Sequence, residues 1–379
     1  MAKIRLEPFT EAAIPAVQAF NERMRAGGSE FVFPDHPYAD FLPKLPGRKS
    51  YQDMYLLLEG DDVRGGFILR WQDFAVNGEM HRIAHYKLPL SEGIVNPSYA
   101  RLGLQIVRYA LRIEPKIFAL GMGSRERALP KMLEAMKWGM YDVPFSFSVG
   151  HGGAFVRNIK PLRTTEAREQ LFDVAAALGV ADIGIAAVHF GQRLRRRGLA
   201  ALDRGPRPAV DDLTTPFDDW ADDLWQRAMS HYTLCGVRDA EMLNLLYPAE
   251  DLRFIRLRIQ RRGQVLGWAV CLDTQMHRHK QFGDMRVATI VDGLALPDHV
   301  RTVVDSATRH LLARGADMVV SNQGSAAWHS ALLDCGFLDG PSNYIFAASP
   351  KLRQLLEPFD ASSAGFHINR GDGDGPINL

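Results

Sequence analysis

Two carboxylates stand in similar surroundings in the two halves of the sequence. Glu92 begins the segment EGIVNPSYAR, which ends at Arg101, and Asp292 begins DGLALPDHVR, which ends at Arg301. At a constant offset of 200 residues the two carboxylates take equivalent positions at the end of a strand. A carboxylate there can accept a proton from an attacking amine, directly or through water. A strand-end carboxylate that faces water is the alternative interpretation.

Further polar residues are candidates for a binding site. Arg101 and Arg301 can meet phosphates as charge-assisted donors, although a surface arginine in a first helical turn is an equal alternative. Asn322, Ser342 and Asn343 are candidate substrate-binding residues. For the pair at 342–343, a β-turn in which Asn bonds its own backbone is the favoured interpretation.

Metal and thiol chemistry are not expected. His277 and His279 stand close to two aspartates, but no further ligand has characteristic spacing, so an exposed loop is favoured over a zinc site. The three cysteines (Cys235, Cys271 and Cys335) are too few and scattered for a disulfide framework or a redox pair. We therefore predict no metal.

The elements that would position these residues occur twice. Residues 55–69 and 255–270 each predict a β-hairpin, with two apolar strands around a polar, glycine-containing turn. Helical patterns follow at 99–113 and 298–313, then apolar strands at 116–121 and 317–321. Each copy ends in a short helix, a Gly and two strand patterns. The common order predicts a duplicated domain.

The repeat sets the expected domain boundaries. We predict an N-terminal domain over 1–150, a helical connector and linker over 151–216, a C-terminal domain over 217–350 and an extension over 351–379. In the connector, Thr164 is an expected helix N-cap, and Arg195–Arg197 an expected solvated helix end. The turn-rich stretch 201–216 is the expected linker.

Composition limits the classes of function. The chain has 379 residues, 46% of them hydrophobic, and 45 basic against 44 acidic side chains. This predicts a soluble, folded, two-domain protein and argues against a broadly basic DNA-binding protein. The charged start lacks the apolar run of a signal peptide, and no stretch is apolar enough to span a membrane. We expect a cytoplasmic protein, and a homo-oligomer is compatible with the sequence.

The segment SEGIVNPSYARLGLQIV (Ser91 to Val107) resembles the acyl-CoA segment of the GCN5-related N-acetyltransferase (GNAT) superfamily. In that superfamily a Glu-bearing strand ends in Val-x-Pro-x-Tyr-Arg, followed by Gln/Arg-x-x-Gly-x-Gly/Ala at a helix start. Glu92, Val95, Pro97, Tyr99 and Gly103 match. Glycine-rich turns at helix N-termini suit pyrophosphate, because backbone N–H groups approach it closely.

The sequence departs from this pattern at several positions. The phosphate motif has Ala100 and Gln105 at its ends, and Val303 replaces its glycine in the second copy. The position of the superfamily's general-acid Tyr holds Ala135 and Leu332. Two such domains in one chain also resemble Fem-type aminoacyltransferases and other tandem acyltransferases, as do RDAEMLNLLYP (Arg238 to Pro248) and the segment from Ser321 to Phe346.

The resemblance implies an α+β fold with two tandem GNAT-like domains, each a mixed, mostly antiparallel sheet flanked by helices. It implies an acyl-CoA-dependent N-acyltransferase, using acetyl-CoA or another acyl-CoA, that acts on a primary amine of a small molecule or sugar. Under this hypothesis Glu92 is the base and Asp292 binds the ammonium group. The pantetheine would follow Ile94 and Val95, and the pyrophosphate would contact five residues (Arg101, Leu102, Gly103, Leu104 and Gln105).

Two alternatives remain open at this point. A Fem-like transferase would use aminoacyl-tRNA, which the near-neutral charge disfavours. A noncatalytic GNAT-fold binding module would explain the degraded phosphate motif.

Overall fold

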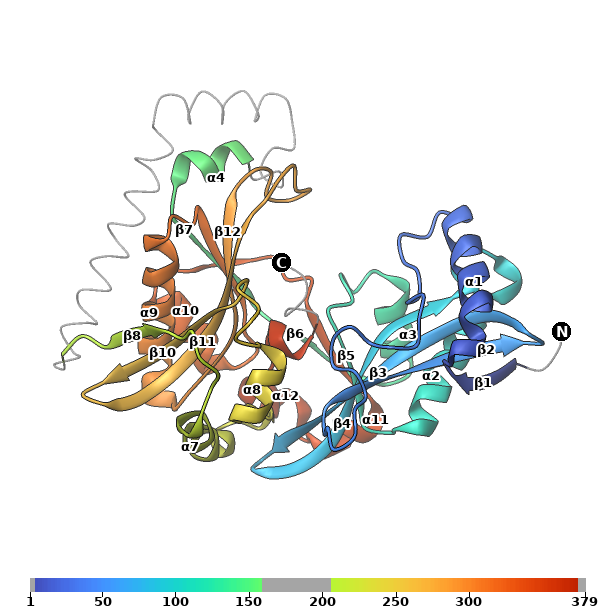
Figure 1. Cartoon of the computed structure of the whole chain (residues 1–379), viewed down its shortest axis with the longest axis horizontal. Coiled ribbons are helices and arrows are strands. Elements are labelled where there is room, and N and C mark those ends of the chain that lie inside the picture. Colours follow the sequence, from blue (N-terminus) through green and yellow to red (C-terminus); the bar gives the residue numbers. More distant parts are fainter. Residues whose placement is uncertain (1–3, 159–205, 374–379) are drawn as a thin grey trace. The chain divides into compact units, whose positions relative to one another are not determined.

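The computed structural model describes residues 4–158 and 206–373 of the chain (Figure 1). Residue contacts divide it into two compact units, neither continuous in sequence. Unit 1 comprises Met1–Asp142 with Asn343–Ser362, and unit 2 comprises Val143–Ser342 with Ser363–Leu379. The divisions at 142/143 and 342/343 differ from the expected boundaries at 150 and 350, because each unit includes a strand from the other half of the chain.

Unit 1 has a sheet with strand order β1-β2-β3-β4-β5-β15-β6. Within this order β4 and β5 are parallel, and the other neighbours are antiparallel. The strands are β1 (Ile4–Pro8), β2 (Tyr51–Glu59), β3 (Asp62–Val76), β4 (Glu79–Ser91), β5 (Ile117–Leu120), β6 (Gly139–Asp142) and β15 (Ile345–Ala348). The helices are η1 (Glu11–Ala13), α1 (Ile14–Ala26), η2 (Glu92–Ile94), η3 (Pro97–Tyr99), α2 (Leu102–Ile113), α3 (Ala128–Ala135), α11 (Pro350–Leu355) and α12 (Phe359–Ser362).

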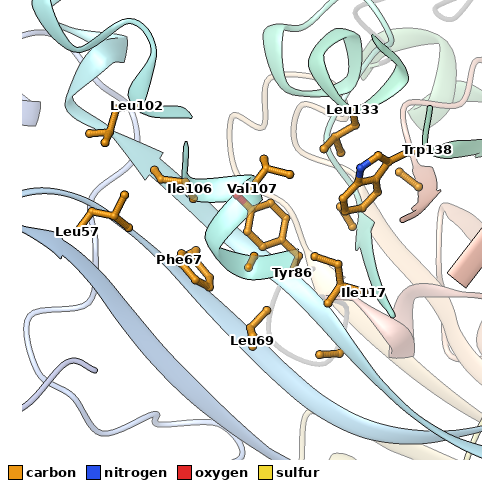
Figure 2. Packing of buried hydrophobic residues seen from close by; sticks show 14 residues of the cluster. Leu57, Phe67, Leu69, Tyr86, Leu102, Ile106, Val107, Ile117, Leu133 and Trp138 are labelled. Atoms are coloured by element: carbon orange, nitrogen blue, oxygen red, sulfur yellow. The ribbon is translucent and has the colours of Figure 1, made fainter. Parts of the chain in front are cut away.

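Alternation along the strands places helices on both faces of this sheet. In β2, Leu56 and Leu58 pack in one cluster with α1, whereas Leu57 belongs to the opposite cluster with α2. Figure 2 shows this second cluster, in which Tyr86 of β4 lies among side chains from α2, α3 and β5. The apolar stripe of α2 (Leu102, Ile106, Val107 and Ala110) supplies its helical side.

Unit 2 has a seven-stranded sheet with the order β14-β7-β13-β12-β11-β10-β8. Its strands are β7 (Phe145–Val149), β8 (Ala209–Asp212), β10 (Ile255–Arg261), β11 (Gln264–Gln275), β12 (Arg286–Ala295), β13 (Met318–Asn322) and β14 (Leu338–Gly340). Outside this order, β9 (Leu234–Gly236) and β16 (Phe366–His367) pair in parallel. The helices are α4 (Gly152–Asn158), α7 (Asp219–Ala228), η5 (Met229–His231), α8 (Ala240–Leu246), η6 (Pro297–His299), α9 (Val300–Ala313), α10 (Ala326–Asp334), η7 (Ser363–Gly365) and η8 (Arg370–Asp372).

The two halves of the chain exchange one strand each. β15 lies between β5 and β6 in the sheet of unit 1, and β7 lies between β13 and β14 in that of unit 2. Val143 and Pro144 link β6 to β7. A two-residue hairpin needs residues that accept positive φ, such as Gly or Asn, so Val-Pro cannot form one. The chain therefore leaves one sheet after β6 and joins the other.

The predicted hairpins, helices and strands of the two copies are present, with shifted ends. The expected linker 201–216 was wrong over Ala209–Asp212, because these residues form β8 and pair with β10. Thr164 and Arg195–Arg197 of the predicted connector lie outside the described residues.

Candidate functional site

The parallel strands of unit 1 separate along their length. The ladder between β4 and β5 contains the pairs Ala84↔Ile117 and His85↔Phe118. β4 continues to Ser91 with β3 on its other side, whereas β5 ends at Leu120 and pairs with β15. One edge of the second half of β4 is therefore not paired with β5.

This half of β4 contains a β-bulge. The register between β3 and β4 shifts between the pairs Gly66↔Leu90 and Ile68↔Lys87. Leu88 has a φ of 44° and Pro89 follows it. A proline has no N–H to donate to a ladder, and bulges redirect strands next to functional sites.

Helix α2 begins beside the end of β4. Arg101 precedes its first turn, Leu102 is part of the apolar cluster, and Arg101 and Gln105 are exposed. A Cβ atom added to Gly103 would meet nothing within 4 Å. The first turn therefore has open space at Gly103, where backbone N–H groups and the helix dipole favour an anion.

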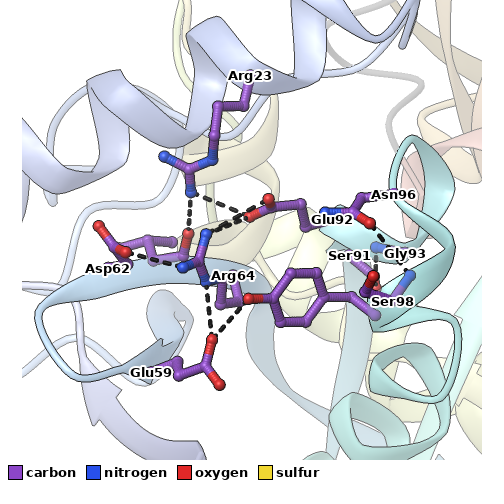
Figure 3. A network of polar contacts seen from close by, with 11 residues as sticks. Arg23, Glu59, Asp62, Arg64, Ser91, Glu92, Gly93, Asn96 and Ser98 are labelled. Atoms are coloured by element: carbon purple, nitrogen blue, oxygen red, sulfur yellow. Dashed lines mark hydrogen bonds and ion pairs between the residues drawn. The ribbon is translucent and has the colours of Figure 1, made fainter. Parts of the chain in front are cut away.

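Glu92 lies in a network of charged side chains at the end of β4 (Figure 3). Its side chain is 5% exposed. Arg23 Nη2 donates to its Oε2 at 3.0 Å, and Arg64 Nη1 donates at 3.2 Å. An amine would compete with these two guanidinium groups for the carboxylate. The contacts therefore favour a positioning role for Glu92 over that of a base.

Arg64 connects Glu92 to the β2–β3 hairpin. Its Nε donates to Glu59 Oε2 at 3.3 Å, and its guanidinium lies 4.9 Å from the ring centroid of Tyr99. Tyr99 O–H donates to the same Glu59 oxygen at 2.6 Å, and this bond lowers the pKa of Glu59. Arg23, Glu59 and Arg64 were missed in the sequence, because they lie on three elements and match no motif.

The two expected pantetheine contacts differ in environment. Ile94 is 58% exposed. Val95 packs against the chain that leaves α1, since a Cβ on Gly27 would lie 2.3 Å from the Val95 Cβ. Val95 thus helps to position α1.

Two buried donors on the α2 face of the sheet have no partner within the described residues. They are Tyr86 Oη and Trp138 Nε1, in residues that are 2% and 3% exposed. Both residues belong to the cluster in Figure 2, and Tyr86 is the first β4 residue after the ladder with β5 ends. Burial raises the pKa of Tyr86 well above its usual value, which keeps its hydroxyl protonated. An unpaired buried donor is costly, so each is a candidate ligand contact.

The strand registers correct the equivalence of Glu92 and Asp292. A Cβ on Gly65 would lie 2.6 Å from Leu90 O, and one on Gly267 would lie 2.6 Å from Leu294 O. Leu90 thus corresponds to Leu294, and counting toward the helix places Glu92 opposite Leu296. In the other direction the bulge adds a residue to β4, so Lys87, which pairs with Ile68, takes the place of Asp292, which pairs with Val270. The constant offset fails because η2 lengthens the connection between strand and helix in the first copy.

The helices correspond at a different offset from the strands. The same two glycine positions would contact Ile106 of α2 and Val303 of α9. Val303 therefore corresponds to Ile106, and Val300 occupies the place of Gly103.

Asp292 is fully buried in unit 2, and its carboxylate accepts hydrogen bonds from other groups of the chain. Its Oδ2 accepts from Arg238 Nε at 2.6 Å and from Tyr247 O–H at 2.7 Å. Its Oδ1 accepts from Asn369 Nδ2 and from the Gly293 N–H, both at 2.8 Å. These contacts argue against the role of Asp292 as a base or ammonium ligand, because its acceptor positions are already used.

Two of the other expected substrate-binding residues bond neighbouring backbone carbonyls, since Asn322 Nδ2 donates to Pro144 O at 3.4 Å and Ser342 to Val143 O. Asn322 Oδ1 accepts from Arg370 Nε at 3.0 Å. Ser342 O–H donates to Val143 O at 2.5 Å and so holds the segment that follows β6, whereas Asn343 is exposed.

Within the described ranges, no three His, Cys, Asp or Glu side chains form a group able to hold a metal ion. His279 Nδ1 instead accepts the N–H groups of Gln281 and Phe282 in a loop. In the same part of the chain, no helix is long and apolar enough to cross a bilayer.

Comparisons with solved structures identify the fold. A conserved protein of unknown function from Enterococcus faecalis V583, described as a probable N-acyltransferase, aligns over 94% of this chain and 75% of its own, at 8% identity and a TM-score of 0.50. Saccharomyces cerevisiae N-myristoyltransferase with bound myristoyl-CoA aligns over 92% and 82%, at 10% identity and a TM-score of 0.51.

The chain has a tandem GNAT-like fold, with two mostly antiparallel sheets flanked by helices. The predicted fold class and the duplicated domain are confirmed. No protein-family model matches the sequence. No curated protein matches it either.

Proposed function

We propose that the protein is an acyl-CoA-dependent N-acyltransferase whose donor binds in unit 1. The observation that carries this proposal is the separation of β4 from β5, with a bulge at Leu88–Pro89 and open space at Gly103 beside it. A linear thioester can run along an unpaired strand edge, and its pyrophosphate can meet the start of α2.

Two further observations support an acyl-CoA donor. The yeast N-myristoyltransferase, which has a similar fold, was solved with bound myristoyl-CoA. In this chain, Tyr86 presents a buried donor without a partner beside the end of the β4–β5 ladder, and Trp138 presents another in the same cluster. Residues 101–105 supply an exposed Arg and an uncovered glycine at the helix start, so the residues present fit such a donor.

The roles of the residues follow from their contacts. Acyl-CoA would supply an acyl group activated as a thioester. Backbone N–H groups on the unpaired edge of β4 would stabilise negative charge on its carbonyl oxygen. Glu92 would hold Arg23 and Arg64 at the strand end rather than take the amine proton itself. A primary amine of a small molecule or sugar is the proposed acceptor. Its nitrogen would bond the acyl carbon as the C–S bond breaks, and the proton that the nitrogen loses would leave with CoA as the free thiol.

Calorimetric titration with acetyl-CoA and a series of longer acyl-CoAs tests the proposal. We expect saturable binding that Gly103→Trp abolishes and Arg108→Trp leaves unchanged, because Arg108 is an exposed residue farther along α2. Absence of binding to the folded wild-type protein at millimolar ligand would refute the donor assignment. A noncatalytic module or an aminoacyl-tRNA donor would then be the next hypotheses.

A further inference from the structure

The C-terminal segment Phe366–Asp372 lies between the two parallel strands of unit 2. The ladder between β12 and β13 ends at Ile290↔Ser321. Beyond it, His367 Nε2 donates to Gly293 O at 2.8 Å on the β12 side. On the β13 side, the Gly324 N–H donates to Ile368 O at 2.8 Å, and Gln323 forms a β-bridge with Asn369.

A buried charge network holds the end of this segment. Arg238 is bonded to Asp292 on β12 through Nε and to Asp372 through Nη2, at 2.6 and 2.7 Å. Asn369 and Asp372 also form a capping box around η8. All three charged side chains are fully buried.

Residue 371 must be glycine, because its backbone lies very close to the side chains of Tyr247 and Asp292. A Cβ at that position would lie 2.3 Å from Tyr247 Oη and 2.5 Å from Asp292 Oδ2. A larger residue at 371 would therefore displace the segment from the strand gap.

We propose that unit 2 is a closed copy of the donor site, in which the chain's own C-terminal segment fills the strand gap. This inference rests on the proposed function, because it leaves the gap of unit 1 as the place for acyl-CoA. Arg238, Asp292 and Tyr247 form the part of unit 2 that holds the segment.

The difference between the copies follows from one strand position. In the strand registers Ile68 pairs with Lys87 as Val270 pairs with Asp292, so the residue of β4 at the place of Asp292 is Lys87, which has no carboxylate. Unit 1 thus lacks the carboxylate that anchors a peptide segment in unit 2. Conversely, Val300 is 1% exposed at the place where Gly103 has open space, so α9 lacks the open position that α2 has there.

Amide hydrogen exchange tests the closure without any acyl-CoA. We expect Gly371→Val to accelerate exchange of residues 291–295 and 322–324 at least tenfold, while exchange in β4 stays unchanged. Asn369→Ala, which removes one hydrogen bond to Asp292, is the milder variant if Gly371→Val does not fold. Lys351→Val, at an exposed position on α11, is the matched control. Unchanged exchange at these amides in a folded variant would overturn the proposal.

Acyl-CoA titration then separates this inference from the proposed function. If both hold, wild type binds one equivalent and Gly103→Trp binds none. Binding that survives Gly103→Trp but is lost in Gly371→Val would place the donor in unit 2 and overturn the closure. Accelerated exchange in Gly371→Val with no acyl-CoA binding to wild type would support the closure and refute the donor function alone.

Discussion

Arg238 Nε and Asp292 Oδ2 lie 2.6 Å apart, and both side chains are fully buried. Their positions in the sequence are 54 residues apart. Tyr247, in the same RDAEMLNLLYP segment as Arg238, donates to the same carboxylate oxygen. This segment, which resembles one of tandem acyltransferases, therefore supplies two partners of one buried acid. The RDAEMLNLLYP segment has a structural role here, because its Arg238 and Tyr247 hold Phe366–Asp372 in place.

Removing one partner of this network should destabilise the protein strongly. We expect Arg238→Met to lower the free energy of unfolding by about 3–5 kcal/mol, because it leaves Asp292 and Asp372 buried without a counter-charge. Denaturant unfolding followed by tryptophan fluorescence measures the change. Arg253→Ala, which breaks the exposed pair with Asp251, should cost less than about 0.5 kcal/mol. Equal losses in the two variants would contradict this account.

The unpaired hydroxyl of Tyr86 predicts an unusual effect on stability. Tyr86→Phe should leave the free energy of unfolding unchanged or slightly higher, because no protein hydrogen bond is lost. Acyl-CoA affinity or turnover should fall if the hydroxyl contacts the donor. A buried tyrosine with partners is the control. Tyr232 O–H donates to Ala295 O and accepts from Trp328 Nε1, so Tyr232→Phe should cost about 1–3 kcal/mol. A comparable loss in Tyr86→Phe would show that its hydroxyl has a structural partner such as water.

Substitution at Gly103 should separate binding from folding. Because its Cβ position is open, Gly103→Trp should unfold at the same denaturant concentration as wild type. Its acyl-CoA affinity should fall at least about tenfold, which equals about 1.4 kcal/mol. Gly65→Val is the opposite case, since a Cβ there would meet the Leu90 carbonyl at 2.6 Å and should destabilise unit 1. Full affinity in a folded Gly103→Trp variant would exclude the start of α2 as the binding site.

His367 should make stability depend on pH. Burial lowers the pKa of His367 below its ordinary value of 6.5, so the folded state holds this ring neutral. The unfolded state binds the proton more readily, and stability should therefore fall as the pH drops below about 6.5. Above that pH the ring is neutral in both states, so the stabilising contribution of His367 is fully present. The slope is at most about 1.4 kcal/mol per pH unit for one proton.

Unfolding midpoints measured across this pH range test the assignment. His367→Gln keeps a donor for Gly293 O and should show a shallower decline below pH ~6.5. His277→Gln, in the exposed loop, should decline as wild type does. Identical slopes in wild type and His367→Gln would assign the decline to other groups.

The sequence by itself determined the kinds of elements and their order. Hairpins, amphipathic helices and buried strands follow from local periodicity and turn residues, so both copies and the GNAT-like fold could be predicted from it. The segment from Glu92 to Gly103 marked the end of β4 and the start of α2, and the structure places open space at Gly103. Helices, strands and their ends depend mainly on residues close together in the sequence, so local patterns predict them.

The tertiary structure decided what each polar group contacts and to which sheet each strand belongs. β7 and β15 have the patterns of ordinary terminal strands, and only packing shows that they are exchanged, although Val143–Pro144 excludes a tight hairpin. Asp292 looked equivalent to Glu92 because sequence offset ignores the extra turn at η2. Its partners Arg238 and Asn369 are distant in sequence, and burial of a charge depends on such long-range contacts rather than on the residues beside it.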